Sequence, residues 1–346
     1  MARYALLLLP STNRVYADAA VRLSVAELEV FNTSVLDGRL SEITETTIGG
    51  VPYLTFTADG IRDRDAGLLS NMSSIYALFR RVDERLLEPV ELRPLDRLDD
   101  DLLTILKYQG KTNEQFTKLL LNVTLLGSGF AGEMLDRKFR VLDPLCGRGT
   151  TLNQALMYGF DAAGVDVDQK DFEAYCSFIQ TWLKRKRLKH SAEVTRIRRD
   201  KQVVGRRLHV DLGVTKESYK AGETLELVYV NADTAKAPEF YRPASFDLVV
   251  ADAPYGVQHG SRTAGRGLHR SPLDLLAAAA PGWARLLRPG GALGISWNTN
   301  VADRSDAAAV LAGAGLEPLD SGPYLGFAHR VDQAIVRDIL VARRGS

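Results

Sequence analysis

Cysteine is scarce in this chain of 346 residues, which contains two cysteines, Cys146 and Cys176. Two cysteines provide no disulfide framework and no paired spacing typical of a zinc site. The five histidines do not cluster with cysteines or acids at metal-ligand spacing either. The sequence therefore predicts no metal centre, and its low cysteine content favours the reducing cytoplasm.

Long hydrophobic runs are also missing. The apolar start at residues 4–9 is too short for a signal sequence, and polar residues follow it directly. No segment approaches the roughly 20 apolar residues that are needed to span a membrane. We therefore expect no membrane partner.

Net charge is nearly absent, because 44 basic residues oppose 43 acidic ones, yet one segment is strongly unbalanced. Residues 184–207 contain eleven Lys and Arg against only Glu193 and Asp200. A solvated helical face normally carries both signs of charge, so this basic insertion predicts contact with phosphates of a nucleic acid.

The first 90 residues carry a complete alternation of short elements. A strand at residues 4–9, a helix opened by the S-x-x-E capping box at residues 24–27 and a hairpin around Gly49-Gly50 come first. A helix near 64–69 and a strand near 75–80 complete the order β-α-β-β-α-β, which predicts a small α+β domain of ferredoxin-like topology. A charged, proline-containing stretch follows, and we assign residues 91–113 as a linker.

The nine residues DPLCGRGTT, 143–151, follow a short apolar run and precede a segment of helical spacing. In an α/β domain such a loop lies at the carboxyl edge of the sheet, where Gly147 and Gly149 let the backbone approach a ligand closely. Leu152 breaks the dinucleotide fingerprint, and no Gly-Lys-Ser/Thr follows as in a P-loop. The loop thus predicts a nucleotide-like cofactor of another kind.

The segment DAPY, 252–255, follows the predicted strand at 246–250. The carboxylate of Asp252 can accept one N–H of an aromatic amine, and the backbone carbonyl of Ala253 can accept the other. Pro254 restricts the geometry of the residue before it, and Tyr255 offers a ring on which a base can stack. These four residues are the predicted catalytic set.

Together, DPLCGRGTT and DAPYG resemble the motifs of DPPY-type S-adenosylmethionine-dependent amino-methyltransferases, with Ala253 where Pro is commonest. Taken as a whole, the chain is most similar to the THUMP-associated tRNA guanine-N2 methyltransferases, although residues 90–107 leave no room for a THUMP domain. The resemblance implies a Rossmann-like class I methyltransferase domain over 114–346, with a mostly parallel seven-stranded sheet. The basic insertion at about 184–207 lies within this domain.

The resemblance also implies cofactor contacts. An acid at Asp143 would contact the methionine ammonium, Asp166 the ribose hydroxyls with Asp168 in reserve, and Asp233 the adenine amine. A segment upstream of the glycine loop would cover the methionine end, with Phe116, Thr117 and Asn122 as candidates. Cys146 is interpreted as a packing residue. The predicted cofactor-binding set is Asp143, Leu145, Cys146, Gly147, Gly149, Thr150, Asp166, Val167, Asp233, Phe116 and Thr117.

These patterns predict a cytoplasmic methyltransferase acting on an exocyclic amine of a nucleic-acid base, first of all guanine N2 in tRNA or other RNA. RNA, favoured over DNA, would be held by the basic insertion and the amino-terminal domain, and His259 is a further base-pocket candidate. Two alternatives stay open: a DNA adenine-N6 or cytosine-N4 methyltransferase, and a catalytically silent nucleic-acid-binding module. The oligomeric state is not predicted.

Overall fold

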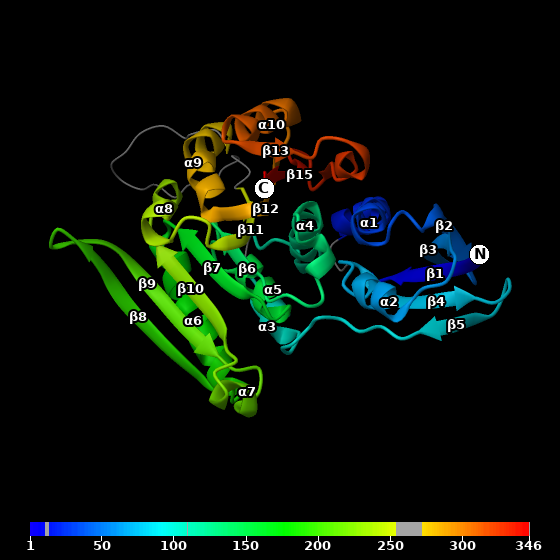
Figure 1. The fold of residues 1–346 in the computed structure, drawn as a ribbon, viewed down its shortest axis with the longest axis horizontal. Coiled ribbons are helices and arrows are strands. Elements are labelled where there is room, and N and C mark those ends of the chain that lie inside the picture. Colours follow the sequence, from blue (N-terminus) through cyan, green and yellow to red (C-terminus); the bar gives the residue numbers. More distant parts are fainter. Residues whose placement is uncertain (11–13, 109, 254–271, 346) are drawn as a thin grey trace.

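The computed structural model describes residues 1–10, 14–108, 110–253 and 272–345. Two β-sheets lie side by side with helix α4 between them (Figure 1). The smaller sheet is built from the amino-terminal residues and the larger one from the rest of the chain. The predicted pairing of a small α+β unit with a mostly parallel α/β unit is therefore confirmed.

The smaller sheet is antiparallel and has the order β2-β3-β1-β4-β5. Its first four strands and the two helices follow one another as β-α-β-β-α-β, the ferredoxin-like order that the sequence predicts. Tyr4, Ala5 and Leu6 at the centre of β1 are all buried, and Tyr4 and Leu6 belong to the hydrophobic core. The elements are β1 (Ala2–Leu8), α1 (Arg14–Val35), β2 (Ser41–Ile48), β3 (Val51–Ala58), α2 (Asp63–Leu69), β4 (Ile75–Arg81) and β5 (Leu87–Val90).

The predicted capping box at residues 24–27 is wrong. Helix α1 begins at Arg14, so Ser24 lies in the middle of it and is buried. Glu27 is fully buried too, and it faces another part of the protein instead of capping its own helix. The S-x-x-E pattern was misleading because the same spacing also places two side chains on one face of a continuing helix.

The larger sheet has ten strands where the sequence predicted seven. Five neighbouring strands are parallel, and antiparallel strands extend the sheet at both edges. The strands are β6 (Arg140–Asp143), β7 (Asp161–Asp166), β8 (His190–Arg199), β9 (Gln202–Leu212), β10 (Leu225–Asn231), β11 (Phe246–Asp252), β12 (Leu287–Asn298), β13 (Leu316–Pro318), β14 (His329–Arg330) and β15 (Val336–Arg344).

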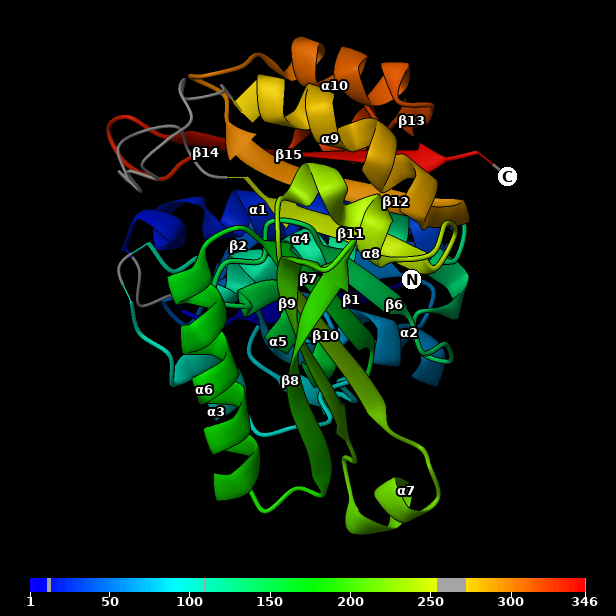
Figure 2. The same ribbon diagram turned by 90° about the vertical axis from the view of Figure 1, so that its left-hand side faces the viewer.

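Helices cover both faces of this sheet, because its central strands are apolar on both sides. In β11, Leu248 and Val250 pack toward α4, α5 and α6, whereas Val249 and Ala251 pack toward α9 and α10. Figure 2 shows α9 and α10 on one side of β12 and β15, and α4 and α1 on the other. The helices, 3-10 turns included, are α3 (Asp101–Thr104), α4 (Glu114–Gly127), η1 (Ala131–Glu133), α5 (Thr150–Met157), α6 (Gln169–Arg185), α7 (Lys216–Lys220), η2 (Thr234–Lys236), α8 (Ala237–Phe240), α9 (Pro272–Leu286), α10 (Arg304–Gly313) and η3 (Gly322–Leu325).

A buried polar network joins the amino-terminal part to the larger sheet. The Glu27 carboxylate of α1 accepts hydrogen bonds from the Ser73 hydroxyl at 2.6 Å and from Asn122 Nδ2 of α4 at 2.7 Å. Asn122 Oδ1 accepts in turn from the Tyr158 hydroxyl at 2.9 Å. Burial raises the pKa of Glu27, and these donors oppose that rise. Asn122 is fully buried and thus connects the two parts of the protein.

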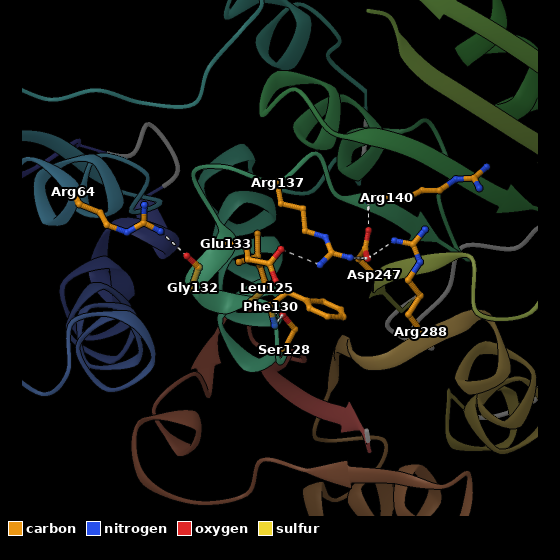
Figure 3. Close-up of polar contacts among 10 residues, drawn as sticks. All are labelled: Arg64, Leu125, Ser128, Phe130, Gly132, Glu133, Arg137, Arg140, Asp247 and Arg288. Atoms are coloured by element: carbon orange, nitrogen blue, oxygen red, sulfur yellow. Dashed lines mark hydrogen bonds and ion pairs between the residues drawn. The ribbon is translucent and has the colours of Figure 1, made fainter.

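A second buried carboxylate fixes the amino edge of the larger sheet (Figure 3). Asp247, at the start of β11, accepts from Arg137 at 2.6 Å, from Arg288 at 2.8 Å and from the Arg140 backbone N–H at 2.8 Å. The guanidinium of Arg137 also lies 4.1 Å from the ring centroid of Phe130. Two cations of the chain itself therefore neutralise Asp247.

Replacing Glu27 should test the joining network. Glu27→Ala leaves Ser73 and Asn122 without their acceptor in a buried site, so we expect the free energy of unfolding to fall by about 1–3 kcal/mol. Glu29→Ala, on the exposed side of the same helix, is the control and should change it by less than about 0.5 kcal/mol. Equal effects of the two replacements in urea denaturation would contradict the role given to Glu27.

Candidate active site at the carboxyl edge of the sheet

Three carboxylates lie at the carboxyl ends of three neighbouring parallel strands. Asp143 ends β6, Asp166 ends β7 and Asp252 ends β11. Strands β7 and β11 both pair in parallel with β6, so the three ends meet at one edge of the sheet. This edge is where ligands bind in open α/β sheets.

Asp143 is buried and 3% exposed, and it makes its hydrogen bonds close by. Its Oδ1 accepts from the Leu145 backbone N–H at 2.9 Å, and the Thr151 hydroxyl also bonds to it. Burial raises the pKa of Asp143 to about 7, and the nearby Asp166 and Asp252 contribute in the same direction. Within the described ranges no basic side chain forms an ion pair with this carboxylate. Among the described residues, Asp143 is therefore a buried carboxylate whose hydrogen-bond donors are neutral.

The glycine loop makes a tight turn between β6 and α5 and contacts the end of β7. Gly147 and Gly149 have φ values of +46° and +78°, a region that favours glycine. A Cβ on Gly149 would come within 2.3 Å of the Tyr175 ring, so a larger residue does not fit. The Gly147 N–H donates to Asp166 Oδ2 at 2.8 Å, which joins the loop to the second acid.

Cys146 is buried inside this loop, as predicted for a packing residue. A Cβ on Gly164 would lie 2.6 Å from the Cys146 sulfur, so the thiol fills the space that this glycine leaves. Burial raises the pKa of Cys146 well above its ordinary value, and a protonated thiol is a poor nucleophile.

Asp166 and Asp168 have different roles. Asp166 lies at the strand end, where burial raises the pKa of its carboxyl group. Asp168 caps helix α6, accepting from the backbone N–H groups of Lys170 and Asp171. Between them, Val167 is 71% exposed and presents an apolar surface at the same edge. Asp166 therefore stays the predicted ribose ligand, and Asp168 caps helix α6.

Asp252 is held by hydroxyl groups from two distant parts of the chain. The Thr112 hydroxyl donates to Oδ2 at 2.6 Å, and the Ser296 hydroxyl donates to Oδ1 at 2.8 Å. Arg337 of β15 lies 3.9 Å from Oδ2, with its guanidinium 4.2 Å from the ring centroid of Phe116. Sequence reasoning missed all three partners, although Thr112 lies in the segment expected to approach the site.

Phe116 and Thr117, which were predicted to cover the methionine end of the cofactor, lie in α4. Phe116 is fully buried in α4, and Thr117 is 3% exposed with its hydroxyl donating to the Asn113 carbonyl. Neither offers side-chain surface to a ligand in this structure. The segment before them does reach the glycine loop, because the Tyr108 hydroxyl lies 3.2 Å from that of Thr150 and the Arg148 guanidinium lies 4.7 Å from the Tyr108 ring centroid.

The remaining predicted residues divide between the site edge and the undescribed segment. Asp233 follows β10, is exposed, and accepts from the Ala235 backbone N–H at 2.9 Å. Ala253 is 3% exposed and donates its backbone N–H to the Ser296 carbonyl at 2.8 Å. Pro254, Tyr255 and His259 lie outside the described residues. Leu145 is half-buried beside Asp143 in the glycine loop.

Two negative findings concern the described residues alone. Across 1–10, 14–108, 110–253 and 272–345, no three His, Cys, Asp or Glu side chains form a group able to hold a metal ion. In the same ranges, no helix has the length and apolar character needed to cross a membrane.

A parallel sheet in this strand order, with a glycine loop after its first strand and acids at successive strand ends, defines a class I methyltransferase. Residues 134–291 match the family model described as UPF0020, RMKL-like, methyltransferase domain. This match confirms the prediction of a methyltransferase that uses S-adenosylmethionine. Curated proteins give no match.

Solved structures of similar fold include several methyltransferases. TrmN from Thermus thermophilus is 17% identical, with a TM-score of 0.38, over 75% of this chain and 56% of its own. A TehB-like S-adenosylmethionine-dependent methyltransferase from Corynebacterium glutamicum is 16% identical, with a TM-score of 0.33, over 63% and 85%. The 16S rRNA methyltransferase RsmC of T. thermophilus is 15% identical, with a TM-score of 0.30, over 62% and 38%.

The residues present fit the cofactor at its charged end and along the loop. The buried carboxylate of Asp143 suits an ammonium group, the two glycines leave the backbone accessible, and Asp166 can accept from hydroxyls. When bound, S-adenosylmethionine supplies an activated methyl group. The described residues would orient that group toward Asp252 at the neighbouring strand end.

Cofactor affinity should depend on pH through Asp143. Below its pKa of about 7 the group is protonated and cannot pair with an ammonium, so affinity should rise as the pH increases from about 5 to about 7. The free energy of unfolding without cofactor should change in the opposite direction. The contribution of Asp143 to this free energy is fully present below the pKa of Asp143 in the unfolded chain and is lost as the pH rises through about 7. Calorimetry should show that Asp143→Asn weakens binding and removes most of this pH dependence, and an unchanged pH profile would exclude Asp143 from the ammonium site.

Asp166 and Asp168 form a matched pair for a second test. Asp166→Ala should weaken S-adenosylmethionine binding at least tenfold, about 1.4 kcal/mol, because the ribose hydroxyls lose their acceptor and Gly147 loses its partner. Asp168→Ala removes only a helix cap and should lower the free energy of unfolding by about 1 kcal/mol with little effect on affinity. The reverse order of affinities would assign the ribose to Asp168.

Proposed function

We propose that this protein is an S-adenosylmethionine-dependent N-methyltransferase that modifies an exocyclic amine of a nucleic-acid base, with guanine N2 in tRNA or other RNA as the first candidate. The observation that carries the proposal is the position of Asp252. It ends a strand beside Asp143, and hydroxyl groups fix both of its oxygens. Its carboxylate is therefore held in one orientation at the carboxyl edge of the sheet.

An amine attached to an aromatic ring is a poor nucleophile, because its lone pair is conjugated with the ring. The carboxylate of Asp252 would accept one N–H of the amine and hold the nitrogen in line with the methyl group. The backbone carbonyl of Ala253 would accept the other N–H, and Tyr255 would stack on the base. As the new N–C bond forms, positive charge develops on nitrogen, and the carboxylate opposite it lowers the energy of that state.

Binding of RNA would involve the basic insertion at 184–207 and the amino-terminal domain. This domain would span residues 1–90, a linker residues 91–113 and the methyltransferase domain residues 114–346. RNA is favoured because the chain resembles tRNA methyltransferases in its motif pair. The joining of both sheets through Glu27 and Asn122 supports a fixed position of the amino-terminal domain beside the site. A DNA substrate would be methylated by the same chemistry, and analysis of the methylated nucleosides distinguishes DNA from RNA.

Asp252→Asn is the decisive replacement for the chemistry. The amide keeps the size of the side chain but can turn an NH₂ donor toward the substrate amine and carries no negative charge. We expect methyl transfer in single turnovers to fall by about a hundredfold or more, with cofactor affinity barely changed. Asp306→Asn, on an exposed site of α10, provides the control. Wild-type turnover in Asp252→Asn would refute the proposal and favour a silent binding module.

The product identifies the substrate. Mass spectrometry of nucleosides from tRNA and from DNA, in cells with and without the gene, should show one methylated base that depends on the gene. N2-methylguanosine in tRNA is the expected result. A gene-dependent N6-methyladenine or N4-methylcytosine in DNA would instead support a DNA methyltransferase.

A further inference from the structure

The basic insertion is not a single surface, because its two basic runs lie at opposite ends of the larger sheet. Strands β8 and β9 form a hairpin that extends the sheet beyond β10. Arg206 of β9 pairs with Asn231 of β10, and Asn231 pairs with Asp166 of β7. Arg206 is therefore level with the carboxyl edge where the site lies.

The hairpin continues past this edge. Arg196 pairs with Arg206, so residues 197–205 extend beyond the end of β10 on the same side as Asp166 and Asp252. At about 3.3 Å per residue, the turn of the hairpin at residues 200–201 lies about 15 Å beyond the edge. Figure 1 shows the hairpin along the outer side of the sheet with its turn past the end of β10. We use the name hairpin tip for residues 196–206.

The hairpin tip is held in place by two ion pairs and keeps other cations exposed. Arg199 pairs with Glu239 of α8, and Arg206 pairs with Glu173 of α6 at 2.7 Å. Arg196, Arg198 and Lys201 are exposed and form no ion pair with the described part of the protein. Arg196 and Arg206 also line a hollow between the hairpin and the start of α6.

The other basic run lies far from the site. Helix α6 begins beside the carboxyl edge and runs for 17 residues to Arg185, about 25 Å away toward the other edge. Beyond it, Lys186 forms ion pairs with Asp99 at 2.8 Å and with Asp101 at 2.7 Å. Lys186 therefore joins the preceding segment to the helix. Lys184, Arg185 and Arg187 are exposed at this distant end.

We propose that the hairpin tip alone is the phosphate-binding arm for the substrate RNA, with Arg196, Arg198 and Lys201 contacting the backbone next to the modified nucleotide. This inference rests on the proposed function. Strand β9 lies four strands from β11, roughly 19 Å at 4.8 Å per strand, so the tip cannot touch the base at Asp252. It can contact phosphates of neighbouring nucleotides, which fix the register of the RNA without reading its sequence.

Two variants with equal loss of charge test the inference. The tip variant replaces Arg196, Arg198 and Lys201 by Gln, and the distant variant replaces Lys184, Arg185 and Arg187 by Gln. Binding of unfractionated tRNA is measured over a range of salt concentrations. The tip variant should lower the slope of log K against log salt by about 3, one unit for each lost phosphate contact, and the distant variant by less than about 1.

Kinetics and cofactor binding supply the second measurement. The tip variant should raise the KM for tRNA and leave kcat nearly unchanged, because the tip does not touch the reacting atoms. S-adenosylmethionine affinity and the unfolding midpoint should remain at wild-type values in both variants, which shows that they are folded. A change in kcat with no change in KM would contradict a role limited to binding.

The outcomes separate the inference from the function on which it rests. Equal slopes in the two variants, or a wild-type slope in the tip variant, would overturn the inference while methylation by the wild-type protein still stood. If the wild-type protein binds tRNA through the hairpin tip but methylates neither tRNA nor DNA, the proposed function is refuted, and the role of the hairpin tip in binding phosphates still stands. Tighter binding of single-stranded DNA of matched length through the same residues would replace RNA as the partner.

Discussion

The parallel pairing of β7, β6 and β11 is the constraint on which the site depends. Each of these strands ends in an aspartate, and parallel pairing brings the three ends to one edge although they are separated by up to 109 residues. The central strands are buried on both faces, so a slip in register would expose apolar side chains as well as displace a carboxylate. Packing and chemistry therefore favour the same register.

The two edges of this sheet differ in how the negative charge of a buried aspartate is compensated. At the amino edge, Asp247 is neutralised by Arg137 and Arg288, so the chain itself completes the interaction. At the carboxyl edge, Asp143 is also buried, its donors among the described residues are neutral, and burial raises its pKa to about 7. A buried carboxylate without a cation is costly in the free protein. A ligand with an ammonium group would pair with the carboxylate and remove that cost, so this ion pair would contribute to the free energy of ligand binding.

The segment between the two sheets takes part in the site. Thr112 donates to Asp252, and Tyr108 lies against Arg148 and Thr150 of the glycine loop. The same segment contains Asp101, which pairs with Lys186 at the far end of α6. A stretch that the sequence marks as a linker thus connects the glycine loop, Asp252 and the amino-terminal part of the protein.

The sequence by itself determined the order of the elements, the glycine loop and the acids at the strand ends, because strand periodicity, glycine and turn residues are local signals. Local signals were also the source of the error at Ser24, where a capping pattern occurs inside a helix. Only the tertiary structure decided that Ser296 and Thr112 hold Asp252 and that Asp168 caps a helix beside Asp166. It also decided that one basic run of the insertion lies at the far end of α6 and the other in the β8–β9 hairpin at the carboxyl edge. These contacts join residues distant in the chain, and their geometry follows from strand register, which no short segment of sequence specifies.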